Sequence, residues 1–288
     1  MYRQMDIWLP GREGGPQQSR TTGRDLRKLL ARLNTEHQIG LPPQFFGYDD
    51  GGAPDFTARP SFMLGENSQD SVRIVAIGPE ASQTLLETSG PIQAALIRDY
   101  KALVHATMRG GAHAIEPSGG NGYARCRYHA HRIVVGKTTF ESWWWRSAAQ
   151  FDAVGQWSAR DHLRLADLIA TGIFEQARTL LLSGDEVEGE MGEWLERCIA
   201  TEEPKIAQLM FKKRLGVQVE SIAGYTAHRA TGPRGLRVML KGVEFSMAAK
   251  LQGPWVVGRN RIEGNGLIQM SRNQRPVAAS TQATPEAA

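Results

Sequence analysis

A glycine- and arginine-rich stretch near the C-terminal end carries the residue types best suited to binding a polyanion. It reads GPWVVGRNRIEGNGLI over residues 253–268. Between its two apolar runs lie Gly258, Arg259, Arg261, Gly264 and Gly266. Glycine lets a backbone approach a ligand closely, and backbone N–H groups beside guanidinium groups form a seat for phosphates. The stretch lacks the Lys-Ser/Thr ending of a P-loop and the G-x-G-x-x-G spacing, so it favours a polyanion over a nucleotide cofactor. A hairpin with solvated arginines would show the same pattern.

Other cations gather around this stretch in the sequence. From Arg229 to Arg275 there are nine Lys/Arg and only two acidic residues. Such segregation suggests a basic face for a polyanion. An Arg/His/Tyr-rich segment, RCRYHAHRIVVG, adds side chains that can contact RNA sugar and phosphate. Besides the loop, we predict RNA contacts from Lys241, Arg234, Arg237, Arg125, Arg127 and His129.

The RCRYHAHRIVVG segment alternates like a strand. One predicted face holds Arg127, His129, His131, Ile133 and Val135, and the other holds Cys126, Tyr128, Ala130 and Arg132. The two histidines supply at most half of a structural zinc shell. We therefore expect no metal site and no cofactor.

Catalytic candidates cluster around the first helix. The sequence shows no Ser-His-Asp order, H-E-x-x-H motif or paired carboxylates. Cutting RNA needs none of these, because the 2′-hydroxyl is an internal nucleophile and a protein needs only to orient it and stabilise charge on the phosphate. Arg20 and Arg24 precede or begin the helix, where unpaired N–H groups attract anions. His37 follows it and suits general acid or base catalysis, although an exposed histidine at a helix end is an equal alternative.

Elements that can position these residues are visible along the N-terminal half. Leucines at 26, 29, 30 and 33 predict a helix, and SFMLG and SVRIVAIG predict strands. Pro79 opens a second predicted helix, and residues 91–108 read as a further one. The Gly-rich stretch 110–122 is the predicted domain boundary.

The C-terminal half begins with the RCRYHAHRIVVG strand. Residues 139–215 then read as helical, four strands follow, and the tail after Arg275 is small and polar. This order predicts an α+β fold of two ferredoxin-like units, with a helical insertion in the second. The predicted domains span 1–118 and 119–275, with a disordered tail at 276–288.

Composition narrows the class of protein. The chain has 288 residues, of which 41% are apolar, enough for a sizeable core. No window approaches the ~20 apolar residues of a membrane span, and the first residues lack a signal-peptide core. Cys126 and Cys198 do not form a disulfide scaffold. We expect a cytoplasmic protein with no membrane partner.

Three segments resemble the RAMP superfamily of CRISPR proteins. They are LRKLLARLN, SVRIVAIGPEASQTLL and, above all, GVEFSMAAKLQGPWVVGRNRIEGNGLI. Within the superfamily the chain is most similar to the repeat-cleaving endoribonucleases of type IV and related class 1 systems. The resemblance implies tandem ferredoxin-like domains, metal-independent cleavage of a CRISPR repeat 3′ of its hairpin, and retention of the RNA among other effector-complex subunits. The helical stretch 139–215 resembles the helical finger of the type IV branch.

The resemblance also implies roles for particular residues. His37 matches the histidine that many members use, whereas Arg24 and the loop pair Arg259 and Arg261 match the arginines of the type IV branch. Two other functions remain open: a non-catalytic RAMP subunit that caps the guide RNA, and a general RNA-binding protein outside CRISPR systems.

Overall fold

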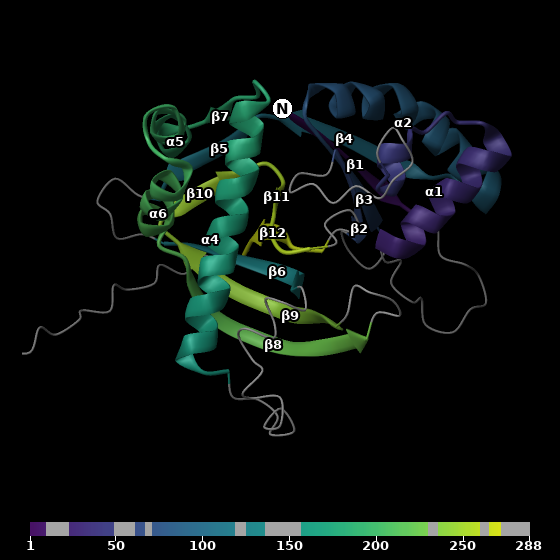
Figure 1. The fold of residues 1–288 in the computed structure, drawn as a ribbon. Helices are drawn as coiled ribbons and strands as arrows, with labels where there is room; N and C mark the ends of the chain where they lie inside the picture. Colours follow the sequence, from purple (N-terminus) through teal and green to yellow (C-terminus); the bar gives the residue numbers. More distant parts are fainter. Residues whose placement is uncertain are drawn as a thin grey trace, which may run out of the picture.

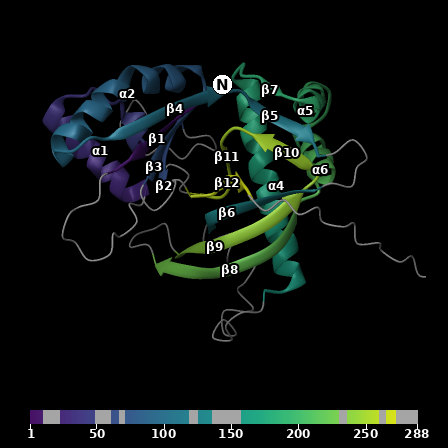
Figure 2. The same ribbon diagram turned by 180° about the vertical axis from the view of Figure 1, so that it is seen from behind.

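A computed structural model gives the fold of the chain (Figure 1). It describes residues 1–9, 23–48, 61–66, 71–118, 125–135, 157–229, 236–259 and 265–271. Two α+β units lie side by side in both the front and the rear view (Figures 1 and 2). No helix of the described residues is both long and apolar enough to cross a membrane.

The first unit is a four-stranded antiparallel sheet with two helices on one face. In chain order its elements are β1 (Tyr2–Trp8), α1 (Gly23–His37), η1 (Pro43–Phe46), β2 (Phe62–Glu66), β3 (Ser71–Ile77), α2 (Pro79–Tyr100) and β4 (His105–Gly111). The strands lie in the order β2-β3-β1-β4. This is the arrangement of the β-α-β-β-α-β ferredoxin-like motif.

Leucine spacing explains why α1 forms and how it packs. Leu26, Leu30 and Leu33 are fully buried and share a core with Met5 and Ile7 of β1. Residues three and four apart lie on one helix face, so this stripe turns toward the sheet. The prediction of a helix here is confirmed.

The second helix continues through a proline. A separate helix over 91–108 was predicted, but α2 runs unbroken from Pro79 to Tyr100 with Pro91 inside it. Ile92 and Leu96, on the far side of that proline, are completely buried. Tertiary packing thus outweighs the lost backbone hydrogen bond. Of the remainder of the predicted helix, residues 101–104 form a turn and connection and residues 105–108 belong to strand β4, so that prediction is wrong beyond Tyr100.

The second unit repeats the strand order of the first. Its elements are β6 (Cys126–Val135), α4 (Ala159–Leu182), β7 (Val187–Glu188), α5 (Glu190–Thr201), α6 (Pro204–Leu215), β8 (Gln218–Arg229), β9 (Leu236–Met247), β10 (Ala249–Gln252), β11 (Trp255–Val256) and β12 (Leu267–Met270). The five-stranded sheet has the order β11-β12-β6-β9-β8. In the first sheet the second, third, first and fourth strands of the chain lie side by side in that order. Without the short edge strand β11, the second sheet has the same order, because β8-β9-β6-β12 are its second, third, first and fourth strands. The chain therefore folds as tandem ferredoxin-like units.

One helix of the repeated motif has no counterpart. Between β9 and β12, where the first unit has α2, the described residues form only the short strands β10 and β11. α4 contacts both β8 and β11, at the two edges of the sheet. In chain order, the Gly-rich loop thus stands where the first unit has α2.

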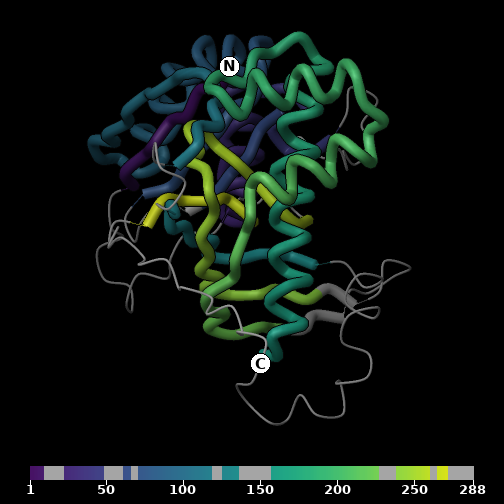
Figure 3. The backbone as a smooth tube through the Cα atoms, turned by 90° about the vertical axis from the view of Figure 1, so that its left-hand side faces the viewer, coloured from purple at the N-terminus to yellow at the C-terminus, as the bar shows by residue number. Residues whose placement is uncertain are grey.

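The helical stretch forms part of the body of the second unit. The sequence predicts this stretch over 139–215, and the family resemblance likens it to a helical finger. From Ala159 to Leu215 it consists of α4, α5 and α6 with β7 between them. All three helices bury side chains in one core, such as Phe174, Leu195 and Phe211. Both α5 and α6 contact α4, and Figure 3 shows the three helices beside one another. Residues 139–156 lie outside the described part.

The two units share buried surface. β5 (His113–Pro117), just before the predicted boundary at residue 118, pairs with β10 and β7 of the second unit. Met63, Val75 and Ile77, on the sheet face away from α1 and α2, belong to the core of the second unit. The exact domain limits stay a prediction.

Candidate nucleic-acid interface

The Gly-rich loop, residues 253–268, belongs to a hairpin that docks on the edge of strand β6. Trp255 pairs with Ile268 to join β11 and β12, and β12 continues onto β6. Beyond the strands, the N–H of Arg259 donates to the carbonyl of Val134 at 2.8 Å. The N–H of Gly266 donates to the carbonyl of Arg132 at 2.5 Å. Both ends of the loop are thus fixed to β6.

Two of the loop glycines permit this docking. A Cβ on Gly258 would lie 2.7 Å from the carbonyl oxygen of Val134, and one on Gly266 would lie 1.7 Å from that of Val257. Both residues also have positive φ, near 80°. We had interpreted them as letting the backbone approach a ligand. In the structure they let the loop approach its own sheet.

The side chains of β6 do not alternate as predicted. Tyr128 and Ala130 are buried, but so are Ile133 and Val135, which were expected on the opposite face with His129. All four belong to the core beneath α4. The change of face falls opposite Gly242 of β9, whose φ of 55° breaks the regular pleat. The predicted two-face assignment is therefore wrong beyond His131.

This shift gathers cations beside the loop. Arg132 lies directly opposite Lys241 of β9, and Arg259 forms an isolated bridge with Val134. Paired residues of neighbouring strands share a face, so Arg132, Lys241 and Arg259 lie on the face opposite the core. Lys241 and Arg259 are exposed. We call these three residues the loop-side cluster.

The other end of the same strand is balanced by carboxylates. Arg127 lies 3.5 Å from Glu220. His129 pairs in register with Glu244, which accepts a hydrogen bond from Ser221 at 3.1 Å. A phosphate here would meet negative charge as well as positive, whereas among the described residues the strand pairs of the loop-side cluster contain no Asp or Glu. The predicted RNA-binding residues of β6 and β9 thus divide into two environments.

Arg125 binds protein atoms. Its guanidinium donates to the carbonyl of Gly216, to the carbonyl of Ser246 at 3.0 Å and to the Ser246 hydroxyl at 3.1 Å. Burial lowers the pKa of Arg125 from its ordinary value. These contacts join the start of β6 to the end of α6 and to β9. The predicted RNA contact of Arg125 gains no support from this geometry.

Some predicted residues lie outside the described part of the chain. They are Arg20, Arg234, Arg261 and Gly264. Arg237 pairs with His228 through its backbone, but its side chain is also outside the described part.

The catalytic candidates of α1 lie at opposite ends of one helix. Arg24 is exposed in the first turn, and His37 is the last helical residue, not a residue beyond the helix as expected. Thirteen positions at 1.5 Å per residue separate them by ~20 Å. The side chain of Asn34 accepts a hydrogen bond from the N–H of Leu41 at 2.8 Å, so the chain folds back after the helix. A single phosphate cannot contact both Arg24 and His37.

The predicted active centre joins two elements from different units. α1 packs against β2, α2 and η1, whereas the hairpin packs against α4 and β6. The position of a centre between α1 and the Gly-rich loop stays a prediction.

Arg132 is the candidate that the sequence interpretation missed. Strict alternation placed it on the face of Tyr128, away from Arg127 and His129. The available signal was Gly242, because an isolated glycine inside a strand pattern indicates a bulge and hence a change of face. Sequence inspection without the pairing register did not connect Gly242 with Arg132.

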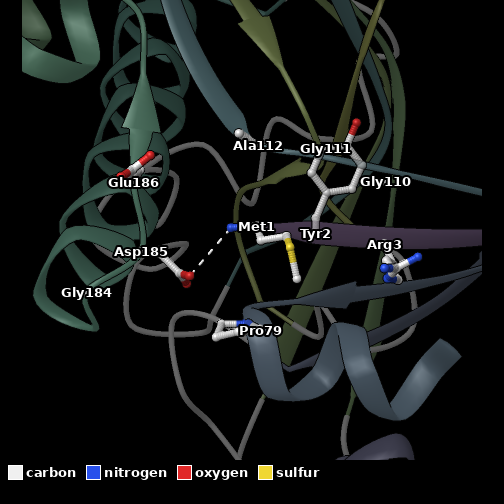
Figure 4. A pocket seen from close by; sticks show the side chains of 10 residues that line it. All are labelled: Met1, Tyr2, Arg3, Pro79, Gly110, Gly111, Ala112, Gly184, Asp185 and Glu186. Carbon is white, nitrogen blue, oxygen red and sulfur yellow. Dashed lines mark hydrogen bonds and ion pairs between the residues drawn. The ribbon is translucent and has the colours of Figure 1, made fainter. Parts of the chain in front are cut away.

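A cavity of about 680 Å³ lies elsewhere, where the two units meet (Figure 4). It is lined by the start of β1, by Gly110 and Gly111 of β4, and by the turn before β7. In that turn Asp185 lies 3.5 Å from the ammonium group of Met1. None of the predicted site residues that the structure describes lines this cavity. Within the described ranges, no three His, Cys, Asp or Glu residues are grouped so that they could hold a metal ion.

Comparisons with known proteins identify the family. No curated protein matches the chain. The solved structure titled "Csf5, CRISPR-Cas type IV Cas6 crRNA endonuclease" is 18% identical, with a TM-score of 0.59, and the match covers 94% of this chain and 99% of that one. A crystal structure of Cas6b is 14% identical with a TM-score of 0.48, over 94% and 99% of the two chains. The family model described as "Type IV CRISPR-associated endonuclease Csf5" matches residues 12–272, and the chain therefore belongs to this family of RAMP-like CRISPR endonucleases.

Proposed function

We propose that this protein binds the stem-loop of a CRISPR repeat, cleaves the RNA at the 3′ base of the stem without a divalent metal, and remains bound to the product as an effector-complex subunit. The observation that carries the proposal is the loop-side cluster, which gathers Arg132, Lys241 and Arg259 on one face beside a loop fixed by its own backbone. Family membership supplies the class of reaction and of RNA.

The chemistry requires little from the protein beyond charge and orientation. The 2′-hydroxyl loses its proton to water or a base and attacks the adjacent phosphorus. The bond from phosphorus to the 5′-oxygen breaks, and the leaving oxygen takes up a proton. The products are a 2′,3′-cyclic phosphate and a 5′-hydroxyl. Arginine side chains stabilise the extra negative charge that develops on the phosphate oxygens.

The loop-side cluster has the features needed to bind a duplex backbone. A-form RNA is recognised mainly through shape, phosphate and 2′-hydroxyl contacts, for which exposed cations on a rigid surface are suited. Lys241 and Arg259 are exposed and are held by strands or by strand-like pairing. We assign this cluster to binding of the stem.

We assign cleavage to the N-terminal end of α1. There Arg24 is exposed in the first turn, where the backbone N–H groups also favour a phosphate. Arg20 precedes this turn in the sequence and would assist. His37 lies at the other end of the helix and would act on a different part of the RNA.

One incubation separates the candidate functions. Purified protein is mixed with end-labelled repeat RNA in EDTA, and the product termini are analysed. We expect one discrete cut and a cyclic phosphate or 3′-phosphate. Cleavage that requires added Mg²⁺ would overturn the metal-independent mechanism. Tight binding without any cut would favour a subunit that only caps the guide RNA, and equal binding of unstructured RNA would favour a general RNA-binding protein.

Retention of the product needs its own measurement. After complete cleavage the mixture is passed over a size-exclusion column, and we expect the stem-containing product to elute with the protein. Elution of that product as free RNA would contradict a role in the assembled effector complex.

A further inference from the structure

A buried glutamine on α4 holds the chain segment that leads into the Gly-rich loop. The side chain of Gln176 is completely buried, and both ends of its amide are used. Its Nε2 donates to the carbonyl of Pro254 at 2.8 Å, and its Oε1 accepts from the N–H of Val256 at 2.9 Å. One side chain thus satisfies a carbonyl and an N–H two residues apart, as a neighbouring β-strand would.

This contact substitutes for a missing strand. β11 lies at the edge of its sheet, paired on one side with β12. Its other side faces α4, whose backbone groups are already bonded within the helix. Buried backbone groups need partners, and Gln176 supplies them from a side chain.

The same face of α4 fixes the next residues of the segment. One helical turn before Gln176, a Cβ on Gly172 would lie 2.8 Å from the side chain of Val257. The helix backbone and Val257 therefore pack closely. From the other side, Nε2 of His113 lies 3.3 Å from the Pro254 carbonyl. The residues that precede Gly258 and Arg259 are thus held on two sides.

We propose that Gln176 is a positioning residue, which fixes the Gly-rich loop so that Arg259 stays in the loop-side cluster. The inference rests on the proposed function for its RNA contact. Arg259 is anchored to β6 by the hydrogen bond from its N–H to the carbonyl of Val134, and the chain reaches it through the segment that Gln176 holds. Loosening that segment removes the guanidinium from its place without altering Arg259 itself.

The first test needs no RNA. Gln176→Met keeps the length of the side chain but removes both hydrogen bonds. Amide hydrogen exchange is followed by mass spectrometry in the full chain. We expect exchange in peptides covering Pro254 to Gly266 to accelerate by at least about tenfold, while peptides from α2 keep the wild-type rate. Unchanged exchange in the loop peptides would overturn the proposal.

The second test asks whether Gln176 acts through Arg259. The affinity for repeat RNA is measured for Gln176→Met, for Arg259→Ala and for the double variant. We expect each single change to weaken binding by about threefold to tenfold. The double variant should bind no more weakly than the weaker of the two single variants, because the free-energy effects of coupled residues do not add. Full multiplication of the two effects would mean that Gln176 does not act through Arg259.

A matched control separates positioning from general stability. Leu195→Ala truncates a fully buried side chain of α5, in the same core as Gln176's neighbours. It should lower the melting temperature as Gln176→Met does, yet leave RNA affinity and loop exchange unchanged. If Leu195→Ala lost as much RNA affinity as Gln176→Met, the effect of Gln176 would be one of general stability and the positioning role would be contradicted. A wild-type protein that binds no repeat RNA would remove the proposed function, whereas the exchange experiment would still decide whether Gln176 holds the loop.

Discussion

Asp6 and Arg73 form a two-point ion pair between the central strands of the first sheet. Nε of Arg73 lies 2.6 Å from one carboxylate oxygen of Asp6, and its terminal nitrogen lies 3.2 Å from the other. Gln4 donates a third hydrogen bond at 3.1 Å. The Asp6 side chain is only 1% exposed, so these partners supply the hydrogen bonds that water would otherwise make.

Removing Arg73 should therefore destabilise the protein strongly. Arg73→Met leaves a buried carboxylate without its cation, and we expect the free energy of unfolding to fall by about 3 kcal/mol. Arg32, which binds Asp99 at 2.7 Å on the surface, provides the control. Arg32→Met should cost about 1 kcal/mol or less, because exposed pairs contribute little. Chemical denaturation measures both, and equal losses in the two variants would contradict the prediction.

Two glycines with the same backbone angle should differ in their tolerance of alanine. Gly40 and Gly266 both have a φ of 80°, but an added Cβ meets nothing within 4 Å at Gly40 and a backbone oxygen at 1.7 Å at Gly266. Gly40→Ala should cost about 1 kcal/mol of unfolding free energy for the left-handed conformation alone. Gly266→Ala should cost at least about 2 kcal/mol more, because the loop backbone must move. Similar melting curves for the two variants would show that Gly266 does not pack tightly against Val257 in the other arm of the hairpin.

The loop arginines should govern the salt dependence of RNA binding. Replacing Arg259 and Arg261 with Ala should flatten the plot of log K against log salt by ~0.7–0.9 per lost phosphate contact. Lys213, exposed on α6, is the control, and Lys213→Ala should leave the slope unchanged. Filter binding at several salt concentrations gives the slopes. An unchanged slope in the arginine double variant would mean that the loop does not contact the RNA backbone.

The two ends of α1 should contribute unequally to cleavage. Arg24→Ala should slow single-turnover cleavage of the repeat RNA ~100-fold, comparable to the loss of one charge-stabilising donor, while affinity changes by only a few-fold. His37→Ala should slow cleavage less, because a phosphate at Arg24 is out of its reach. An inactive His37→Ala beside an active Arg24→Ala would reverse the assignment.

The fold was predictable wherever burial follows a simple period. Leu26, Leu30 and Leu33 indicated a helix, and the order of helical and strand patterns indicated two ferredoxin-like units, as the strand orders of the two sheets confirm. The prediction failed at Pro91, where local propensity argues for a helix end. Packing of Ile92 and Leu96 decided that case, and packing is invisible in a local pattern.

The candidate site was predictable in composition but not in arrangement. The sequence indicated a basic loop and a basic strand, but it could not show that Glu220 and Glu244 accompany only one end of β6. Which end of β6 lies beside carboxylates depends on the register between strands that are far apart in the sequence, such as the pairing of His129 with Glu244. The hydrogen bonds of Gln176 were equally inaccessible, because a single glutamine in an apolar helix face has no periodic signature.

The two backbone anchors of the Gly-rich loop fix its ends and leave the length of the segment between them free to change. Arg259 and Gly266 are fixed to Val134 and Arg132, neighbouring positions on one strand edge, so the segment between them closes a short ring on an already rigid frame. Doubling the length of such a ring costs only ~0.6 kcal/mol in closure entropy. The length and charge of the segment between these two anchors can therefore change at little cost to the sheet beneath.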